Sequence, residues 1–353
     1  MPRDGPRPRW SVMIPVFNGA DELRVSLPSV LAQAPPESEM QIEVVDDCST
    51  RDDPAAVVAA VGGGRASFHR QPVNVGHSRN FNTCLKRARG DIVHLLHADD
   101  WVGPGFYAAM DRLFEAEPSL GAAFCRHQII EPDRSVQWTS PLEQERAGVI
   151  SGWLEQIVGE LRIQAPSIVV RREVYERLGG FDARILSCGE DWEMWTRITA
   201  AGYPVGYVPE ILAFYRDSPE SLTKRSIRSG QNIRDLRNAV GIIGGYLPPE
   251  LVSDARRRGL ENWSRFALRY ANAAAARGDA EATLVQLREA LLCGRSPRTL
   301  RAVAVVAAKL FRARLDSHAP RWRKSREIAG RWLRRAFMRP IRRTIRQLRR
   351  PKP

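Results

Sequence analysis

The first hundred residues alternate short apolar runs with amphipathic stretches, and this alternation constrains the fold more than any other feature of the chain. The apolar runs predict strands over residues 10–16, 42–46, 66–71 and 92–98. The amphipathic stretches predict helices over residues 21–33, 54–61 and 78–89. Strands separated by helices indicate βαβ units, so we expect an α/β fold with a mostly parallel sheet flanked by helices. Ligands of such sheets bind beyond the carboxyl ends of the strands.

The remainder of the chain changes character twice. Residues 120–220 are mixed, with a strand-like run, a short helix and a second apolar run at 122–130, 152–159 and 168–170. Beyond residue 230 the pattern is helical only, and it includes one predicted αα-hairpin over 263–292, which is too little for a repeat array. We therefore predict a disordered lead over 1–9, an α/β domain over 10–229 with halves 10–118 and 119–229, a helical region over 230–294 and a basic tail over 295–353.

The positive charge of the chain is confined to its tail. The sequence has 54 Lys and Arg residues against 40 Asp and Glu residues, a net charge of +14. Residues 295–353 alone contribute +18, which leaves the body slightly acidic at −4. The five cysteines are widely spaced and form no C-x-x-C pair, which argues against a disulfide framework or a zinc site and favours a reducing compartment. We expect neither a signal peptide nor a membrane-spanning segment.

The end of the tail combines many arginines with an apolar stripe. The stripe runs along one face of a predicted helix, at Leu333, Phe337, Ile341, Ile345 and Leu348. This pattern favours an amphipathic helix lying in the plane of an anionic membrane surface. The alternatives are a helix that packs on the protein body and an arm that binds nucleic acid or another polyanion. Nucleic acid is disfavoured because it needs no apolar stripe.

Polar and aromatic residues follow the first two predicted strands. Phe17 comes after the first strand, and Asp46 and Asp47 come after the second. Two carboxylates at the end of a buried strand cost desolvation energy unless they meet donors or a ligand. A pyrimidine ring offers an N–H to a carboxylate and a face to Phe17. The alternative is that Asp47 or Ser49 caps the following helix.

The third and fourth strands are also followed by unusual residues. Residues 74–80 open a helix whose free N–H groups favour an anion, and Arg79 in its first turn opposes the helix dipole unless a phosphate is bound. After the fourth strand come Asp99 and Asp100, a pair suited to Mg²⁺ or Mn²⁺ bridging a diphosphate. Asp-Asp pairs are also common in ordinary turns.

A further acidic cluster opens the helix predicted at residue 190. Glu190, Asp191 and Glu193 would suit the helix dipole without any other role. A carboxylate among indole rings can also act as a general base on a sugar hydroxyl, and the rings of Trp192 and Trp195 could stack on a pyranose.

Seven motifs in this order resemble the family-two glycosyltransferases of the GT-A fold. They are IPVFN at 14–18, VVDDCST at 44–50, NVGHSRN at 74–80, HADDW at 97–101, GGFD at 179–182, EDWEMWTRI at 190–198 and FYR at 214–216. The resemblance covers residues 10–229 and implies a Rossmann-like sheet followed by an α-helical C-terminal region. It also implies inverting transfer of a sugar from a nucleoside-diphosphate sugar, with a UDP-sugar favoured, to an acceptor hydroxyl. Residues 10–118 would bind the nucleotide sugar and residues 119–229 the acceptor.

The resemblance also implies roles for single residues. The nucleotide-binding set is Pro15, Phe17, Asn18, Asp47, Gly76, Arg79, His97 and Asp100. Asp99 matches the last Asp of the family's D-x-D metal motif, and His97 stands in place of the first and could also be a ligand of Mg²⁺ or Mn²⁺. Asp217 follows the Tyr-Arg pair, close to where many relatives carry a metal-binding His. Either Asp217 is an oxygen ligand of the metal, or the metal has no ligand from this part of the chain. Asp191 matches the catalytic base, Glu190 would orient that base or the acceptor, and Trp192 and Trp195 would contact the acceptor.

Two functions of different classes follow from these residues. The first is a bacterial glycosyltransferase of cell-surface polysaccharide or glycoconjugate synthesis, cytoplasmic and peripheral on the inner face of the cell membrane, with a glycan or lipid-linked acceptor. The alternative is a catalytically silent nucleotide-sugar-binding scaffold, motivated by His97 and the missing downstream His. A nicotinamide-dependent dehydrogenase is disfavoured because no G-x-G-x-x-G follows the first strand.

Overall fold

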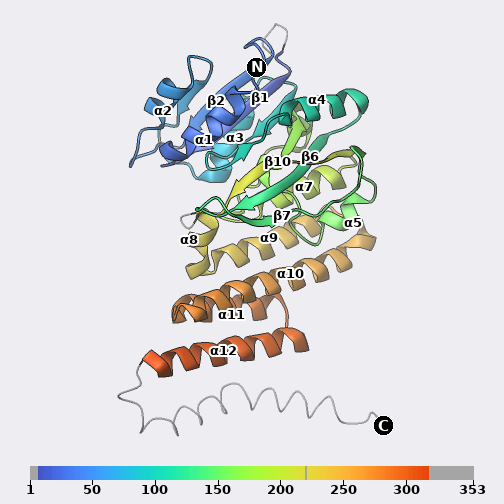
Figure 1. Ribbon diagram of the computed structural model, residues 1–353. Helices are drawn as coiled ribbons and strands as arrows, with labels where there is room; N and C mark the ends of the chain where they lie inside the picture. The colour runs from blue at the N-terminus through green and yellow to red at the C-terminus, as the bar shows by residue number, and fades with distance from the viewer. Residues whose placement is uncertain (1–6, 219–220, 318–353) are drawn as a thin grey trace. The chain divides into compact units, whose positions relative to one another are not determined.

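The structure, a computed structural model, describes residues 7–218 and 221–317 (Figure 1). The chain divides into two compact units. The first comprises the chain up to Ser226 together with Arg234–Asn262, and the second comprises Ile227–Ile233 together with the chain from Trp263. The predicted boundary at residue 229 differs from this division, since the segment 234–262 is part of the first unit.

A single mixed sheet forms the centre of the first unit. Its strands are β1 Trp10–Val16, β2 Met40–Asp46, β3 Ser67–Arg70, β4 Ile92–Leu95, β5 Trp101–Val102, β6 Ala122–Ile130, β7 Val136–Thr139, β8 Gly148–Val149, β9 Ile168–Arg171 and β10 Val205–Arg216. The strand order is β3-β2-β1-β4-β9-β6-β10-β5, with β7 paired to β6 and β8 to β10. β1 to β4 pair in parallel, as do β6 and β10, whereas β9 runs antiparallel between these two blocks. The predicted α/β fold with a mostly parallel sheet is confirmed.

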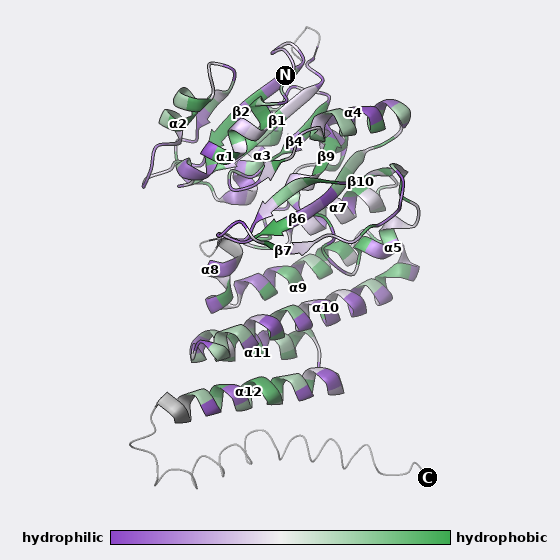
Figure 2. Ribbon diagram, in the orientation of Figure 1, coloured by the Kyte–Doolittle hydropathy of each residue, from purple (hydrophilic) through white to green (hydrophobic). Residues whose placement is uncertain are grey.

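Helices cover both faces of this sheet. Those of the first part of the chain are α1 Ala20–Leu31, α2 Pro54–Val61, α3 His77–Arg87, α4 Phe106–Ala116, α5 Trp153–Ile157, the 3₁₀ turn η1 Ala165–Ser167, α6 Arg172–Leu178 and α7 Glu190–Ala200. α1, α2 and α4 bury apolar side chains against the face of the sheet that carries Val12 and Ile14. α3 contacts β1, β2 and β4, and its Arg87 pairs with Glu43 on the other face. Figure 2 shows the apolar strands between helices that are apolar on one side and polar on the other.

The register of the parallel strands aligns their carboxyl ends. Val16 at the end of β1 is opposite Asp46 at the end of β2, and Met13 in the same strand is opposite Leu95 at the end of β4. The loops that follow β1, β2 and β4 therefore emerge at one edge of the sheet. This alignment brings motifs that are separated by about 80 residues in the sequence to one place.

The chain after β10 is helical, as predicted, with α8 Leu222–Ser229, α9 Gln231–Gly244, α10 Pro249–Ala276, α11 Ala280–Cys293 and α12 Pro297–Ser317. The second unit contains the predicted αα-hairpin. Gly278 adopts φ 72° in the turn, and Asp279 caps α11 by accepting a hydrogen bond from Ala282 N at 3.2 Å. Buried side chains of α10, α11 and α12 form a separate small core.

Most of α9 and the start of α10 belong to the first unit, where side chains of α9 and of the turn after it contact α7 and the loop before α7. Ser187 Oγ donates to Asp235 Oδ2 at 2.7 Å, and Tyr246 OH donates to Glu193 O at 3.1 Å. The predicted membrane-binding stripe at Leu333 to Leu348 lies outside the described residues. Over residues 7–218 and 221–317, no helix combines the length and the apolar character that crossing a membrane requires.

Candidate active site

A cavity of about 530 Å³ opens at the carboxyl edge of β1, β2 and β4. Most of the side chains that line it come from the loops after these strands, from the start of α3 and from the segment before and within α8. Seven of the predicted nucleotide-binding and metal-binding residues line this cavity: Pro15, Phe17, Asn18, Asp47, Gly76, His97 and Asp99. The sequence motifs thus converge on one space large enough for a small ligand.

The loops after β1 and β2 are tied together by Asn18. This residue adopts a left-handed backbone (φ 52°), which Asn tolerates better than most residues. Its side-chain oxygen accepts hydrogen bonds from Thr50 N at 2.9 Å and Arg51 N at 3.0 Å, and its own N–H donates to Ser49 Oγ at 2.7 Å. Beside it the Phe17 ring is 43% exposed at the cavity. Asn18 therefore fixes the loop that presents this ring.

The two aspartates at the end of β2 have different partners. Asp46 is fully buried and accepts a hydrogen bond from Arg70 Nε at 2.6 Å. Asp47 accepts hydrogen bonds from Val75 N at 2.8 Å and Gly76 N at 2.9 Å, one to each oxygen. The carboxylate of Asp47 thus anchors the loop before α3 and still reaches the cavity.

Neither Asp47 nor Ser49 caps α2, so that alternative is wrong. The cap is Asp53, whose side chain accepts a hydrogen bond from Ala56 N at 3.2 Å. The polar residues directly after β2 are therefore occupied with loop contacts and with the cavity.

The start of α3 supplies the adjoining wall of the cavity. Gly76 adopts φ 86°, and His77, Asn80 and Phe81 of the following turn line the cavity. Arg79 is exposed and does not line it, which corrects its predicted place in the nucleotide-binding set. The reason is the helical period: residues three to four apart share a face, and Arg79 lies two positions after His77. The motif alone does not show at which residue the helix begins, so it could not show that the Arg79 side chain extends away from the cavity.

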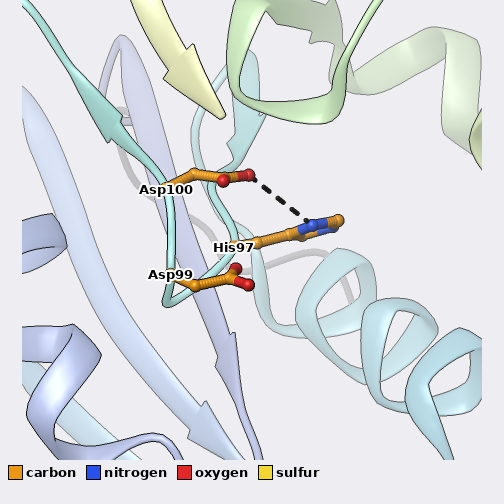
Figure 3. Close-up of side chains that lie close together, drawn as sticks. All are labelled: His97, Asp99 and Asp100. Carbon is orange, nitrogen blue, oxygen red and sulfur yellow. Dashed lines mark ion pairs between the residues drawn. The ribbon is translucent and has the colours of Figure 1, made fainter. Parts of the chain in front are cut away.

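His97, Asp99 and Asp100 form the candidate metal site. Their nearest ligand atoms all lie within 4.8 Å of one another, and their side chains extend to the same side of the loop after β4 (Figure 3). Asp100 Oδ1 accepts a hydrogen bond from Arg216 N at 2.9 Å, whereas Oδ2 is buried, has no hydrogen-bond partner in the described part of the chain and lies 3.9 Å from His97 Nδ1. Phe81 stacks on the His97 ring, with centroids 4.9 Å apart.

The electrostatics of this cluster suit a cation. Burial lowers the pKa of His97, which favours the neutral imidazole that ligates metals. Burial raises the pKa of Asp100 well above its ordinary value, and the neighbouring Asp99 raises it further. An orphaned buried oxygen beside a second carboxylate and a neutral imidazole fits Mg²⁺ or Mn²⁺.

Asp217 does not belong to the candidate metal cluster, which corrects its predicted role. Its Oδ1 pairs with Lys224 Nζ at 2.8 Å and its Oδ2 accepts a hydrogen bond from Gln137 Nε2 at 2.9 Å. Both carboxylate oxygens are therefore engaged with the chain itself. Asp217 instead ties the end of β10 to β7 and to α8.

The first turn of α7 carries the predicted base. Gly189 precedes it with φ 96°, and any Cβ there would lie 2.8 Å from Leu236 Cδ2. Asp191 Oδ1 accepts a hydrogen bond from Trp192 N at 2.7 Å. Burial raises the pKa of Asp191 to about 7, and the neighbouring Glu190 adds to the rise. A carboxyl group that titrates near neutral pH has the property that a general base needs.

The predicted contacts of Trp192 and Trp195 with an acceptor are wrong. Trp192 is 0% exposed and donates from Nε1 to Ile157 O at 2.7 Å, while Trp195 is 3% exposed. Their side chains extend from the face of α7 that packs into the core, so neither ring is available to a sugar. The i, i+3 spacing of the two tryptophans is the expected spacing of a core-facing helix stripe.

Several cavity residues escaped the sequence analysis. They are Glu22, Arg51, Asn74, His77, Leu186, Ser218, Ser221 and Arg225. His77 lay inside a quoted motif but had no assigned role, although a histidine beside a glycine at a helix start was a usable signal. Arg225 belongs to α8, which only the tertiary structure brings to this cavity.

The comparisons with known proteins agree with this geometry. The model of glycosyl transferase family 2 matches residues 11–179. The chain belongs to this family. An uncharacterized protein of Mycobacterium tuberculosis, MT1568, is 30% identical over 70% of this chain and 80% of its own length. The O-antigen biosynthesis protein RfbC of Myxococcus xanthus is 28% identical over 56% of this chain and 16% of its own length. The chain is thus a glycosyltransferase.

Solved structures show the same fold. TarS 1–349 of S. aureus, in complex with UDP-GlcNAc, matches 85% of this glycosyltransferase and 88% of its own chain with a TM-score of 0.61 at 17% identity. The mannosyltransferase PcManGT of Pyrobaculum calidifontis, in complex with GDP-Man and Mn²⁺, matches 90% and 88% of the two chains with a TM-score of 0.53 at 23% identity. These neighbours support the GT-A fold of the family-two member described here.

Proposed function

We propose that this glycosyltransferase binds a nucleoside-diphosphate sugar, with a UDP-sugar favoured, and transfers the sugar to an acceptor hydroxyl with inversion. The observation that carries the proposal is the convergence of the loops after β1, β2 and β4 on one cavity, next to the acidic first turn of α7. The complexes of the structural neighbours with UDP-GlcNAc and GDP-Man support a nucleotide-sugar donor.

The nucleoside would lie against the loops after β1 and β2. The half-exposed Phe17 ring offers a stacking surface for a base, with Pro15 and Asn18 around it. Asp47 accepts one hydrogen bond on each oxygen and can accept another from a base N–H. Arg225 supplies a guanidinium at the cavity for the diphosphate, a role that Arg79 does not fill because it does not line the cavity.

His97, Asp99 and Asp100 would hold Mg²⁺ or Mn²⁺ at the diphosphate. The fit rests on the three convergent side chains and on the unpartnered Asp100 Oδ2. A divalent cation bound there would neutralise negative charge on the departing diphosphate. The Mn²⁺ in the complex of PcManGT supports this assignment.

Asp191 would act as the general base. Its carboxylate takes the proton of the acceptor hydroxyl while the hydroxyl oxygen forms a bond to C1 of the sugar. The bond from C1 to the phosphate oxygen breaks in the same step, and its electron pair leaves with the nucleoside diphosphate. A single displacement inverts the configuration at C1. Glu190, whose Oε2 is buried without a hydrogen-bond partner among the described residues, would orient the base or the acceptor.

The cellular role we propose is synthesis of a cell-surface polysaccharide or glycoconjugate in a bacterium. The name of the relative RfbC supports a polysaccharide context. The charge of +18 over residues 295–353 and the apolar stripe between Leu333 and Leu348 support attachment to the inner face of the cell membrane, where a glycan or lipid-linked acceptor would be available.

The experiment compares release of nucleoside diphosphate by wild type and by Asp191→Asn, with UDP-GlcNAc, UDP-glucose and GDP-mannose as donors and water as acceptor. We expect Asp191→Asn to lose about 10²-fold or more of the release rate, because that is the usual contribution of a general base. Glu173→Gln is the matched control, since Glu173 is also the second residue of a helix but pairs with Arg177 outside the cavity. Equal release by wild type and Asp191→Asn would refute the assignment.

A further inference from the structure

His77 joins the nucleotide cavity to the first turn of α7. Its side chain lines the cavity, and its Nε2 lies 3.3 Å from Glu190 Oε1. The backbone just before it is fixed, because Gly76 N donates to Asp47 Oδ2 at 2.9 Å. A continuous series of contacts therefore runs from the end of β2, through the start of α3, to the residue beside Asp191.

The His77 ring is held on three sides. Ser78 Oγ donates to Ile185 O at 3.1 Å, so the same oxygen can accept from His77 Nε2, which lies 3.1 Å away. Phe81 packs edge-to-face against the ring, with centroids 5.5 Å apart. A proton on Nε2 is thereby shared between Ser78 and Glu190. This geometry fixes the direction in which His77 donates and the position of the Glu190 carboxylate.

Charge strengthens the contact. Burial is the largest single influence on the pKa of His77 and lowers it, but Glu190 and the other acidic neighbours together raise the pKa above its ordinary value. Asp235 of α9 and Asp191 of α7 act in the same direction. Burial raises the pKa of Glu190, but the interactions with His77, with the backbone and with His97 together lower it below its ordinary value. These opposite shifts are those of two buried groups that each favour the charged form of the other.

We propose that His77 is a positioning residue of the transfer reaction, which holds the Glu190 side chain so that Asp191 and the bound donor share one geometry. The proposal rests on the proposed role of Asp191. Only one oxygen of Glu190 is used by His77, and the other has no hydrogen-bond partner among the described residues. Most buried polar atoms in proteins have a hydrogen-bond partner, so an unpartnered carboxylate oxygen beside the cavity is a place where a ligand can bind. The free oxygen is kept for a hydroxyl of the substrate.

The test compares two amides at position 77. Gln places its amide nitrogen near the position of the imidazole Nε2 and can still donate to Glu190, whereas Asn is too short to reach it. We expect His77→Asn to lower the release of UDP from a UDP-sugar by about tenfold or more, because small misplacements of catalytic groups cost large factors in rate. We expect His77→Gln to stay within about threefold of wild type. His69→Gln, on β3 away from the cavity, is the control.

Binding of UDP with Mn²⁺, measured by calorimetry, separates positioning from nucleotide binding. We expect the UDP affinity of both variants to stay within about threefold of wild type. A loss of UDP affinity in proportion to the loss of rate would overturn the proposal, as would an unchanged rate for His77→Asn.

A double-mutant cycle tests whether His77 acts through Glu190. The rate of His77→Asn combined with Glu190→Gln should equal that of Glu190→Gln alone, because residues that act as one unit are not additive. Multiplying effects would overturn the proposal. Asp191→Asn is assayed in parallel: if it stays active, the proposed role of Asp191 as general base fails, whereas an inactive Asp191→Asn with a fully active His77→Asn rejects only the role of His77.

Discussion

Replacing Asp191 by Asn should stabilise the protein while it removes the activity. The raised pKa of Asp191, about 7 against an ordinary 3.8, means that the folded protein binds this proton more tightly than the unfolded chain does. The contribution of Asp191 to the free energy of unfolding therefore falls as pH rises from 3.8 to about 7 and is constant above that. Asn is neutral at every pH and can still accept the hydrogen bond from Trp192 N that Asp191 Oδ1 accepts in the wild type. The substitution thus removes the electrostatic cost and keeps the helix contact.

The size of the effect follows from the shift. Compared with a carboxyl group of unshifted pKa, a shift of about three units lowers the free energy of unfolding by about 2 kcal/mol at pH 5 and about 4 kcal/mol at pH 8. These values are upper limits, because Glu190 relaxes when the neighbouring charge is removed. We therefore expect Asp191→Asn to raise the free energy of unfolding by about 2 kcal/mol more at pH 8 than at pH 5.

Urea unfolding followed by tryptophan fluorescence at the two pH values is the assay. Glu173→Gln serves again as the control, and its effect should not depend on pH in this range. The reasoning would be refuted if Asp191→Asn lowered the free energy of unfolding, or if its effect were the same at pH 5 and pH 8. A gain in stability together with a loss of rate is the expected behaviour of a residue kept for catalysis.

Two further substitutions test the metal site and the packing beside it. UDP with Mn²⁺ should raise the thermal midpoint of the wild-type protein more than UDP alone does, and we expect Asp99→Asn to lose this extra shift. Asp217→Asn should keep the full shift. Equal shifts in the two variants would contradict the assignment of Asp99 as a metal ligand. Gly180→Ala should destabilise the protein by about 2 kcal/mol or more, because the new Cβ would lie 2.0 Å from Asn82 Oδ1, while Gly241→Ala, with open space around it, should be neutral or slightly stabilising in urea unfolding. A tolerated Gly180→Ala would show that Asn82 can move.

The sheet could be predicted because each of its main strands corresponds to a short apolar run in the sequence. The apolar runs at residues 10–16 and 122–130 match β1 and β6, and the helix predicted over 54–61 matches α2. A buried parallel strand and its flanking helices each leave a periodicity that one segment reveals by itself. The antiparallel direction of β9 left no such trace, because strand direction is set by pairing with neighbours that are distant in sequence.

The candidate site was predicted only in part, for a related reason. Residue types suited to a nucleotide or a metal were visible, but which way a side chain extends depends on where its helix begins and what covers it. Arg79 extends to solvent and Trp192 into the core, although both stand inside motifs. Asp217 is engaged by Lys224.

By itself, the sequence determined the fold class, the family and the edge of the sheet at which the site forms, because short-range periodicity and ordered motifs specify all three. The tertiary structure decided which motif residues reach the cavity. It also decided that Arg225 joins them and that His77 meets Glu190, 113 positions away in the sequence, at 3.3 Å. Contacts of this kind depend on packing between distant segments, and no local pattern encodes them.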